Sequence, residues 1–416
     1  MSSLTLIGAH HAVSELLENR PESWDVVRFK GLFERLDRRN VDLVHEMLSL
    51  RSTGEVVARA EMGGRQEPDE ASLPKYLVAE IDDLVVNPMW LIGGGIGVSR
   101  RAGAVSPDYR VFRSRGALLP RFVHHLLRSQ PYLDQYLLYT RAQTTFDRRV
   151  QQPDLDNLPL PVPPLEEQRA IVGYLDREMG CIDTLIEEQQ RLIEMLRERR
   201  AAVISHAVLD ATSVRTQLRR VVDVIDCAHV TAEFVDDDHR YPVASIRECQ
   251  GATVDLSGCN YTTAEFFDHL RASGRAPSPG DLLFIRNVSV GLVSVVTPDL
   301  PEFAVGQETV LLRRSADIDS SFLRYVLIGA EVRHAIEGAM IGSTFRRINV
   351  SAIRALPVPI PSLDEQRRVA VQLDEQTAKI DTLIEESERF IELSRERRSA
   401  LITAAVTGQI DVREMA

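Results

Sequence analysis

The sequence has no long apolar run, few cysteines and almost no lysine. None of its 416 residues lies in a stretch that approaches the roughly 20 apolar residues of a membrane-spanning helix. The N-terminus shows neither a basic leader nor a clean apolar segment. We therefore expect no membrane partner, no signal peptide and a cytoplasmic location. The four cysteines form no CxxC pair, which predicts reduced thiols rather than a disulfide framework.

Common phosphate-binding and metal-binding signatures are also missing. The glycine-rich segment 93–97 lacks the lysine of a P-loop and the spacing of a dinucleotide-binding motif, which favours a flexible turn. The pairs His10-His11 and His124-His125 have no HExxH or cysteine neighbours. We expect these histidines to be half-buried or on the surface, and we expect no metal site.

The charge of the chain is acidic overall but unevenly distributed. The net charge is −12, with 49 basic and 61 acidic residues, and Lys30, Lys75 and Lys379 are the only lysines. Residues 100–149 nevertheless hold ten arginines against three acids. Because arginine can contact a phosphate or a guanine with two parallel hydrogen bonds, this local excess suits nucleic-acid binding. A bias in genomic base composition would produce the same preference for arginine.

One long segment occurs twice. The stretch from Leu158, which reads LPLPVPPLEEQR and continues to RERRAAVISHAV, returns from Leu356 as LPVPIPSLDEQR at an offset of 198, with 28 of 53 positions identical. Each copy has a proline-rich entry, predicted to be an extended connector, and then a long amphipathic helix. Ser362 and Glu365 predict a capping box at the second helix start. The first helix, starting at Leu165, would be roughly 65 Å long.

Apolar residues recur every seven positions in both helices, which predicts a coiled-coil seam between them. Residues 211–355 must join the end of the first helix to the start of the second, so we expect the helices to be antiparallel. The residues expected to pair the helices are Leu175, Ile182, Leu185, Leu192, Leu196, Leu373, Ile380, Leu383, Phe390 and Leu401.

The segments before the two helices resemble each other weakly. Gly280 and Asp281 match Asp82 and Asp83 at the offset of 198, in front of similar apolar runs. We therefore expect an α+β protein, in which two α/β domains are joined by two long antiparallel coiled-coil helices with pseudo-twofold symmetry. The expected segments are 1–157 (first domain), 158–210 (hinge and helix), 211–355 (second domain) and 356–416 (hinge and helix).

This pattern resembles the specificity subunit of type I restriction-modification systems. The motifs that carry the resemblance are LPVPIPSLDEQRR with its helix, LPLPVPPLEEQRA, and GDLLF…GSTFRRIN in the second half. The resemblance covers nearly the whole chain. It implies that each α/β domain is a target-recognition domain that reads one half of a split, asymmetric site in double-stranded DNA, with the helices fixing the spacing.

The resemblance also implies partners. Two methyltransferase (modification) subunits would methylate adenine with S-adenosylmethionine, and a restriction/translocase subunit would cut. It implies no catalytic residue and no cofactor in this chain.

Clustered arginines and nearby hydroxyls are the candidate DNA contacts. They are Arg100, Arg101, Thr145, Arg148, Arg149, Arg286, Ser343, Thr344, Arg346 and Arg347. Solvated arginines, salt bridges to the acidic helices and helix caps are the open alternatives for these positions. The RERR runs at 197–200 and 395–398 lie among acids, and we expect solvated helix faces or partner contacts there.

Two other functions stay open. Asn87-Pro88-Met89-Trp90 is similar to the NPP-aromatic signature of adenine methyltransferases, which would make the chain a self-contained DNA methyltransferase. Met89 stands in place of the second proline, however, and no FxGxG cofactor loop lies nearby, so a strand end is the alternative. The second possibility is a coiled-coil assembly protein without a role in nucleic-acid binding.

Overall fold

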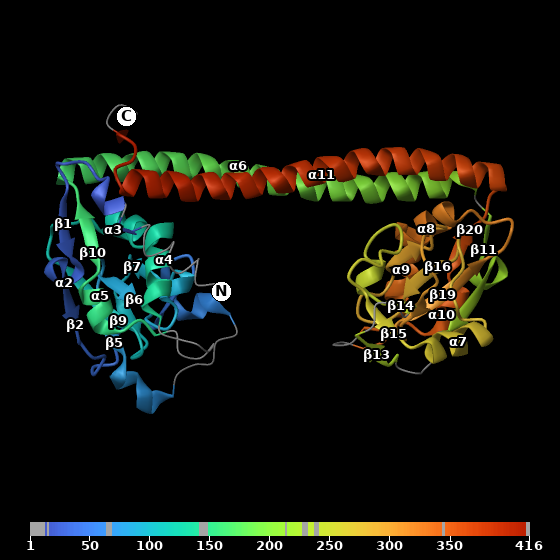
Figure 1. Cartoon of the computed structure of the whole chain (residues 1–416), viewed down its shortest axis with the longest axis horizontal. Helices are drawn as coiled ribbons and strands as arrows, with labels where there is room; N and C mark the ends of the chain where they lie inside the picture. The colour runs from blue at the N-terminus through green and yellow to red at the C-terminus, as the bar shows by residue number, and fades with distance from the viewer. Residues whose placement is uncertain are drawn as a thin grey trace. The chain divides into compact units, whose positions relative to one another are not determined.

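The computed structural model folds into two compact units. It describes residues 13–412, except residues 15, 64–68, 141–148, 213, 227–231, 237–240 and 343–345. Unit 1 consists of Met1–Gln189 and Arg389–Ala416, and unit 2 of Gln190–Glu388. The division cuts both long helices, so each unit contains part of each (Figure 1). The four segments expected from the sequence stay a prediction.

Unit 1 is built around a four-stranded antiparallel sheet in the order β2-β9-β6-β7, with the two-stranded pairs β1-β10, β3-β4 and β5-β8 beside it. The strands are β1 (Asp25–Arg28), β2 (Phe33–Leu36), β3 (Leu48–Leu50), β4 (Val56–Ala58), β5 (Leu77–Ala79), β6 (Leu84–Val86), β7 (Ile96–Val98), β8 (Gly103–Val105), β9 (Arg110–Ser114) and β10 (Pro159–Val162). The helices are α2 (Phe29–Leu32), α3 (Pro120–Leu126), α4 (Gln130–Tyr139), α5 (Gln152–Asp156) and the first part of α6 (Leu165–Ala211), with 3-10 turns η1 (Arg59–Met62), η2 (Glu70–Lys75) and η3 (Leu91–Gly93).

Unit 2 has a four-stranded antiparallel sheet in the order β12-β19-β16-β17, a second sheet in the order β13-β15-β14-β18, and the pair β11-β20. Its strands are β11 (Arg215–Gln217), β12 (Val222–Asp226), β13 (Phe234–Val235), β14 (Tyr241–Ala244), β15 (Asn260–Thr262), β16 (Leu282–Ile285), β17 (Val293–Val295), β18 (Ala304–Val305), β19 (Thr309–Arg314) and β20 (Pro357–Pro359). Its helices are α7 (Ala264–Ala272), α8 (Ser320–Ile328), α9 (Ala330–Ala339), α10 (Val350–Ala355), the last part of α6 and the first part of α11 (Leu363–Val406), with 3-10 turns η4 (Leu218–Arg220) and η5 (Arg247–Cys249). The last part of α11 belongs to unit 1.

The main sheets of the two units correspond strand for strand. Strands β2, β9, β6 and β7 occupy the positions of β12, β19, β16 and β17, and each sheet is followed by helices α3 and α4 or α8 and α9. The central strands are apolar throughout because both of their faces are buried. Leu84 and Leu282 face the core that contains the helices, whereas Val85 and Leu283 face a second core on the other side.

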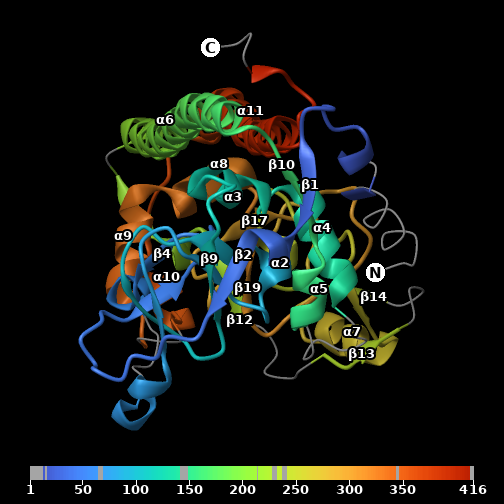
Figure 2. The ribbon, with the colours of Figure 1, turned by 90° about the vertical axis from the view of Figure 1, so that its left-hand side faces the viewer.

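The proline-rich connectors form strands, as the sequence predicts. β10 pairs with β1 and β20 pairs with β11, both antiparallel, and Figures 1 and 2 show β1 and β10 side by side. At the start of α11, Ser362 Oγ accepts a hydrogen bond from the Glu365 amide at 3.4 Å. The Glu365 carboxylate lies 2.5 Å from Arg368 instead of capping Ser362. One half of the expected capping box is therefore present.

The two long helices run antiparallel. In unit 1, Leu175 near the start of α6 shares a core with Val406 at the end of α11. In unit 2, Val208 near the end of α6 shares a core with Leu373 near the start of α11. Opposite ends therefore meet in both units, which confirms the direction predicted from the connection between the helices.

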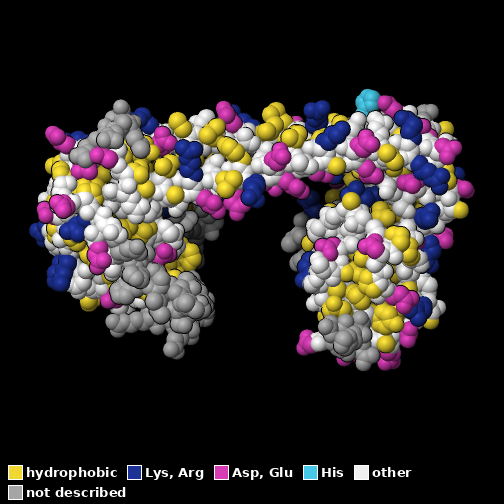
Figure 3. Space-filling model, turned by 45° about the horizontal axis from the view of Figure 1, so that its top comes forward, with side chains coloured by type: hydrophobic (Ala, Val, Ile, Leu, Met, Phe, Trp, Pro, Cys, Tyr) yellow, Lys and Arg dark blue, Asp and Glu magenta, His cyan; other side chains and the backbone are white. Residues whose placement is uncertain are grey.

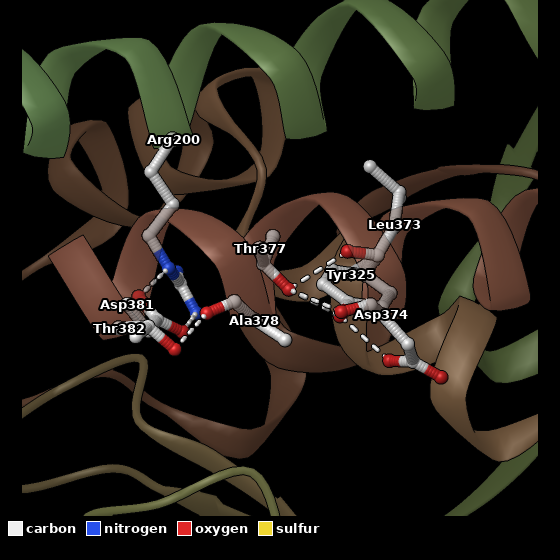
Figure 4. A network of polar contacts seen from close by, with 8 residues as sticks. All are labelled: Arg200, Tyr325, Leu373, Asp374, Thr377, Ala378, Asp381 and Thr382. Carbon is white, nitrogen blue, oxygen red and sulfur yellow. Dashed lines mark hydrogen bonds and ion pairs between the residues drawn. The ribbon is translucent and has the colours of Figure 1, made fainter.

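Equivalent ion pairs join the helices. Arg200 Nε lies 2.7 Å from Asp381 Oδ1 in unit 2 (Figure 4), and Arg398 pairs with Asp183 in unit 1. The offset of 198 converts one pair into the other. The last arginine of each RERR run is thus engaged by the neighbouring helix.

The seam is displaced from its expected position. Leu175, Ile182, Leu196, Leu373 and Ile380 are buried and Leu401 is half-buried, but Leu185, Leu192, Leu383 and Phe390 are 37–47% exposed. The expectation for these last four is wrong. One residue further along, Ile193 and Ile391 are only 6% and 7% exposed. The seam steps by four and then three residues from Ile182, which turns Leu185 outward.

Candidate nucleic-acid interface

A buried glutamine fixes the start of α6 to the domain of unit 1. The Gln168 side chain accepts a hydrogen bond from the Leu119 amide at 2.7 Å. It donates to the carbonyls of Ala117 and Pro163 at 2.9 and 2.8 Å. One fully buried side chain thereby joins three backbone groups from two segments of unit 1.

The same arrangement recurs in unit 2. Gln366, at the start of α11, accepts from the Asp319 amide at 2.9 Å and donates to the carbonyls of Asp317 and Pro361 at 3.1 and 3.0 Å. Further along α11, the Tyr325 hydroxyl of α8 donates to Asp374 Oδ1 at 2.7 Å (Figure 4). The start of each helix is thus rigidly attached to the segment that leads into α3 or α8.

A second shared feature lies at the start of the central strands. Asp83 accepts two hydrogen bonds from Arg113, both at 2.9 Å, and these raise the pKa of that guanidinium. In unit 2 Asp281 lies 3.4 Å from Arg313, and burial raises the pKa of its carboxyl. Both aspartates are almost fully buried. The ion pairs fix one end of β6 and β16, and the hairpin loops extend from the other end.

In unit 2 this hairpin loop meets the segment before α10. The Val288 amide donates to the Arg346 carbonyl at 3.0 Å, and the Ile348 amide donates to the Arg286 carbonyl at 3.0 Å. Asn287 forms an antiparallel bridge with Arg347. Three of the predicted DNA contacts, Arg286, Arg346 and Arg347, therefore line one cleft of about 310 Å³.

The chemistry of this cleft is varied. Arg346 and Arg347 are exposed, whereas Arg286 is half-buried and its NH1 lies 3.2 Å from Asp226 Oδ1. Asn287, Asn349 and Glu308 complete the polar lining. Arginine, asparagine and glutamate are the side chains that pair with guanine, adenine and cytosine edges, respectively. The cleft therefore holds the donors and acceptors that base recognition needs.

Unit 1 has the corresponding contact with different residues. The Val150 amide donates to the Pro88 carbonyl at 3.0 Å, which aligns Pro88 with Arg286 and Arg149 with Arg347. Arg149 is exposed and its Nε donates to Met89 Sδ at 3.2 Å. The loop tip carries Trp90, which is 47% exposed.

Arg110 adds positive charge beneath this surface. Its NH2 donates to the Val150 carbonyl at 3.1 Å. Burial and the neighbouring charges of Arg35 and Arg149 lower the pKa of its guanidinium. The tip of unit 1 is thus arginine-rich and aromatic, whereas that of unit 2 mixes arginine with amide and carboxylate groups.

The remaining predicted DNA contacts lie elsewhere or outside the described residues. Arg100 and Arg101 follow β7 at the end of the β6–β7 hairpin opposite its loop, and Arg101 NH1 lies 2.9 Å from Glu61 Oε1. Both line a cleft of about 630 Å³ beside α6 and are not among the residues that meet at the tip. Thr145, Arg148, Ser343 and Thr344 lie outside the described residues.

Sequence reasoning missed Asn287, Asn349 and Glu308 as members of the cleft. They are single polar residues without a motif. The sequence did offer one signal, the offset of 198. It aligns Pro88 with Arg286 at the point where a strand ends and a variable loop begins, and so marks the loop that contains Asn287.

The Asn87-Pro88-Met89-Trp90 segment forms a turn at the end of β6. Asn87 Oδ1 accepts from the Met89 amide at 3.1 Å, and the Trp90 amide donates to the Asn87 carbonyl at 3.0 Å. The asparagine oxygen that a methyltransferase would offer to its target base is therefore used inside the turn. This geometry fits the interpretation of the segment as the end of a strand better than its interpretation as a methyltransferase motif.

The histidine pair of α3 lies in the 630 Å³ cleft of unit 1. Burial, followed by the charge of its neighbour His125, lowers the pKa of His124 to about 3. Burial and Arg121 lower the pKa of His125 to about 4. Among the described residues no three His, Cys, Asp or Glu side chains are grouped as metal ligands. None of the helices in that part of the chain is long and apolar enough to cross a membrane.

Comparison with known proteins places these features in context. No family model matches the sequence. The specificity subunit of the type I restriction enzyme MjaVIII of Methanocaldococcus jannaschii is 22% identical over 303 residues, which cover 68% of this chain and 69% of that protein. The StySPI specificity subunit of Salmonella potsdam is 28% identical over 138 residues, which cover 32% of this chain and 29% of that protein.

The chain resembles type I restriction specificity subunits. Two solved structures share the fold. A chain from a study of complex assembly and conformational transition in a type I R-M system superposes with a TM-score of 0.73 at 19% identity, over 94% of this chain and all of that one. The HsdS subunit of Thermoanaerobacter tengcongensis superposes with a TM-score of 0.54 at 18% identity, over 94% and 98%. The resemblance inferred from the repeated helices, and the mixed fold with two long paired helices, are thus confirmed.

Proposed function

We propose that this chain is the DNA-recognition subunit of a type I restriction-modification complex. In this proposal unit 1 and unit 2 each read one half of a split, asymmetric site in double-stranded DNA. Arginines contact phosphates and position each unit, and the loop tips contact base edges. The chain itself catalyses nothing.

One observation carries the proposal. Both units attach a long helix through a buried glutamine and present an arginine beside the loop after the central strand, yet the tip residues differ. Arg286, Asn287 and Val288 stand where unit 1 has Pro88, Met89 and Trp90. A shared frame with different tips is what two readers of different sequences require. A coiled-coil assembly protein has no need for it.

Methylome mapping of cells that carry this chain and its methyltransferase tests the proposal. We expect methylated adenine in one motif made of two different specific blocks, separated by a gap of fixed length without sequence preference. A continuous motif, or methylation that does not depend on this chain, would contradict it.

Recruitment of the two methyltransferase subunits is supported by the outer surface of the long helices. Leu185, Phe390 and Leu393 are 41–51% exposed in unit 1, and Leu192, Met195 and Leu383 are 37–59% exposed in unit 2. Figure 3 shows hydrophobic side chains among charged ones along these helices. The offset of 198 relates Leu185 to Leu383, Leu192 to Phe390 and Met195 to Leu393. A duplicated apolar surface suits two identical partners. A restriction/translocase subunit would join this assembly.

The proposal assigns S-adenosylmethionine to the methyltransferase subunits. Titration of the isolated chain with S-adenosylmethionine in a calorimeter should give no binding heat, whereas the complex with methyltransferase subunits should bind it. Binding by the isolated chain would instead favour a self-contained methyltransferase.

The helix pair is proposed to set the spacing between the half-sites. Inserting about seven residues, or two helical turns, at matched positions of both helices should lengthen the gap between the two blocks. The sequences of the blocks should stay the same. If the block sequences change and the gap does not, the helices are not the spacer.

A further inference from the structure

The tip of the unit 2 loop carries a valine in an unfavourable backbone conformation. Val288 has a φ of 60°, in the left-handed region where a β-branched residue is rarely found. Its side chain is nevertheless 66% exposed, so no core packing is gained from it. A glycine or asparagine at this position would relieve the backbone. Packing within the fold therefore does not account for the valine at this strained position, and a role in binding would.

The surrounding hydrogen bonds hold this conformation in place. The Val288 amide donates to Arg346, the Ser289 amide donates to Asn287 at 2.7 Å, and the Gly291 amide donates to Ile285 at 3.0 Å. The loop between β16 and β17 is thus closed at its base and tied to the segment before α10. Val288 is presented at a fixed point rather than on a freely moving loop.

Val288 lines two clefts: one of about 340 Å³ lined mainly by apolar residues, among them Leu292 and Ile336, and the polar cleft of about 310 Å³. The polar cleft is also lined by Arg286, Asn287, Arg346 and Arg347. Val288 is thus an exposed aliphatic side chain among side chains that can hydrogen-bond to the edges of bases. DNA offers an apolar group that such a side chain can contact. Of the groups on the major-groove edges of the bases, the thymine methyl is the apolar one, and aliphatic side chains contact it.

The equivalent tip of unit 1 supports a role in contact rather than in folding. Trp90 holds that position and is 47% exposed, next to exposed Met89. Both units thus place an exposed apolar side chain beside their tip arginine.

We propose that Val288 is a specificity-determining residue that contacts the 5-methyl group of one thymine in the half-site read by unit 2. This inference rests on the proposed DNA-recognition function. It predicts that one position of that half-site prefers thymine for its methyl group, and that removing the valine side chain weakens this preference alone.

The test uses the full chain assembled with its methyltransferase subunits and a randomised double-stranded DNA library. The wild type should select one thymine in the second half-site. Val288→Gly and Val288→Asn should lower the preference at that one position about fourfold, the effect of burying one methyl group, and leave the first half-site unchanged. In a fixed site, deoxyuridine in place of that thymine should weaken the wild type by the same factor and leave Val288→Gly unaffected.

Val214→Gly is the matched control, because Val214 is 67% exposed in the same unit and lines neither cleft of the loop. It should leave every base preference unchanged. Val288→Gly should melt at the same or a higher temperature than the wild type, which separates loss of contact from loss of folding. A residue with a purely structural role would show the melting shift without the change in base preference.

The outcomes are separable. If the wild type selects a split motif but Val288→Gly and Val288→Asn keep every base preference, the role of Val288 is refuted and DNA recognition stands. A second half-site without thymine, or one that tolerates deoxyuridine, refutes it equally. If the wild-type complex selects no split motif, the proposed function itself fails.

Discussion

Unit 1 and unit 2 share their framework and differ at their tips. The framework comprises the buried glutamines Gln168 and Gln366, the buried aspartates Asp83 and Asp281, and sheets with the same strand order. The tips share Arg149 and Arg347 at equivalent positions, but residues 88–90 all differ from residues 286–288. Unit 1 presents methionine and tryptophan, whereas unit 2 presents arginine, asparagine and valine.

The difference shows where sequence variation is tolerated. The glutamines and aspartates of the framework are themselves buried and hydrogen-bonded, so changing one removes several hydrogen bonds at a cost of about 1 kcal/mol each. Residues at the tips project from closed loops into solvent and contribute little to stability. Under the proposed function, recognition could therefore change while the fold remains.

The largest effect is expected at the glutamines. Gln168→Ala and Gln366→Ala should each destabilise their own unit by about 3 kcal/mol, because three backbone groups lose their partner. Hydrogen exchange should show lost protection confined to the unit that carries the change. Gln376→Ala, an exposed glutamine of α11, is the control and should have no measurable effect. Equal loss of protection in both units would contradict the expectation that each glutamine stabilises only the unit that contains it.

The next effect concerns DNA affinity at the tips. Arg149→Ala and Arg347→Ala should each weaken binding of the assembled complex to its site about tenfold, the loss of roughly 1.4 kcal/mol from one arginine contact. The two losses should add in the double variant, since the residues belong to separate units. Titration of labelled DNA measures the affinities. Arg219→Ala, an exposed arginine of η4, should bind like the wild type.

Lowering the pH should destabilise unit 1 more than unit 2. His124 and His125 of unit 1 have lowered pKa values of about 3 and 4, whereas unit 2 has Arg324 and Tyr325 in the corresponding helix. An unfolded chain protonates these histidines near pH 6.5, but folded unit 1 resists protonation. The unfolded state therefore binds more protons, and the stability of unit 1 falls as the pH drops below 6.5.

Hydrogen exchange at pH 7 and pH 5 measures this difference. Protection of unit 1 should fall more than that of unit 2, and the double change His124→Gln with His125→Gln should remove the excess. An excess that persists in the double variant would show that other groups cause it.

The smallest effect is expected at the ion pairs of the helices. A double-mutant cycle on Arg200 and Asp381 should give a coupling of about 0.5 kcal/mol, because both side chains are partly exposed. The pair Arg398 and Asp183 is more exposed and should couple less. Thermal melts in low and high salt measure both cycles. A coupling well above 1 kcal/mol in either unit would mean that the helices depend on these charges.

Much of the frame could be predicted from the sequence because it occurs twice. The offset of 198 located the long helices, the antiparallel direction and the correspondence of Asp83 with Asp281. The seam was misplaced at Leu185, Leu192, Leu383 and Phe390, because apolar residues fall on two adjacent faces of each helix. Spacing alone does not tell which face meets the other helix and which stays exposed.

The tips could be predicted only in part. Paired arginines marked Arg149, Arg346 and Arg347, but Asn287 and Glu308 join the cleft through the pairing of a hairpin loop with the segment before α10. No local pattern encodes that pairing. The conformation of Val288 is equally invisible in the sequence, since valine does not favour a positive φ.

Exchange of a whole reading segment tests the account most directly. Strand pairing aligns Val26 with Arg215, so residues 215–355 can be replaced by a second copy of residues 26–157 while both long helices are retained. Methylome mapping should then show a split motif in which both blocks are the half-site of unit 1. A chimera that assembles and still recognises the original asymmetric motif would contradict the claim that each unit reads its own half-site.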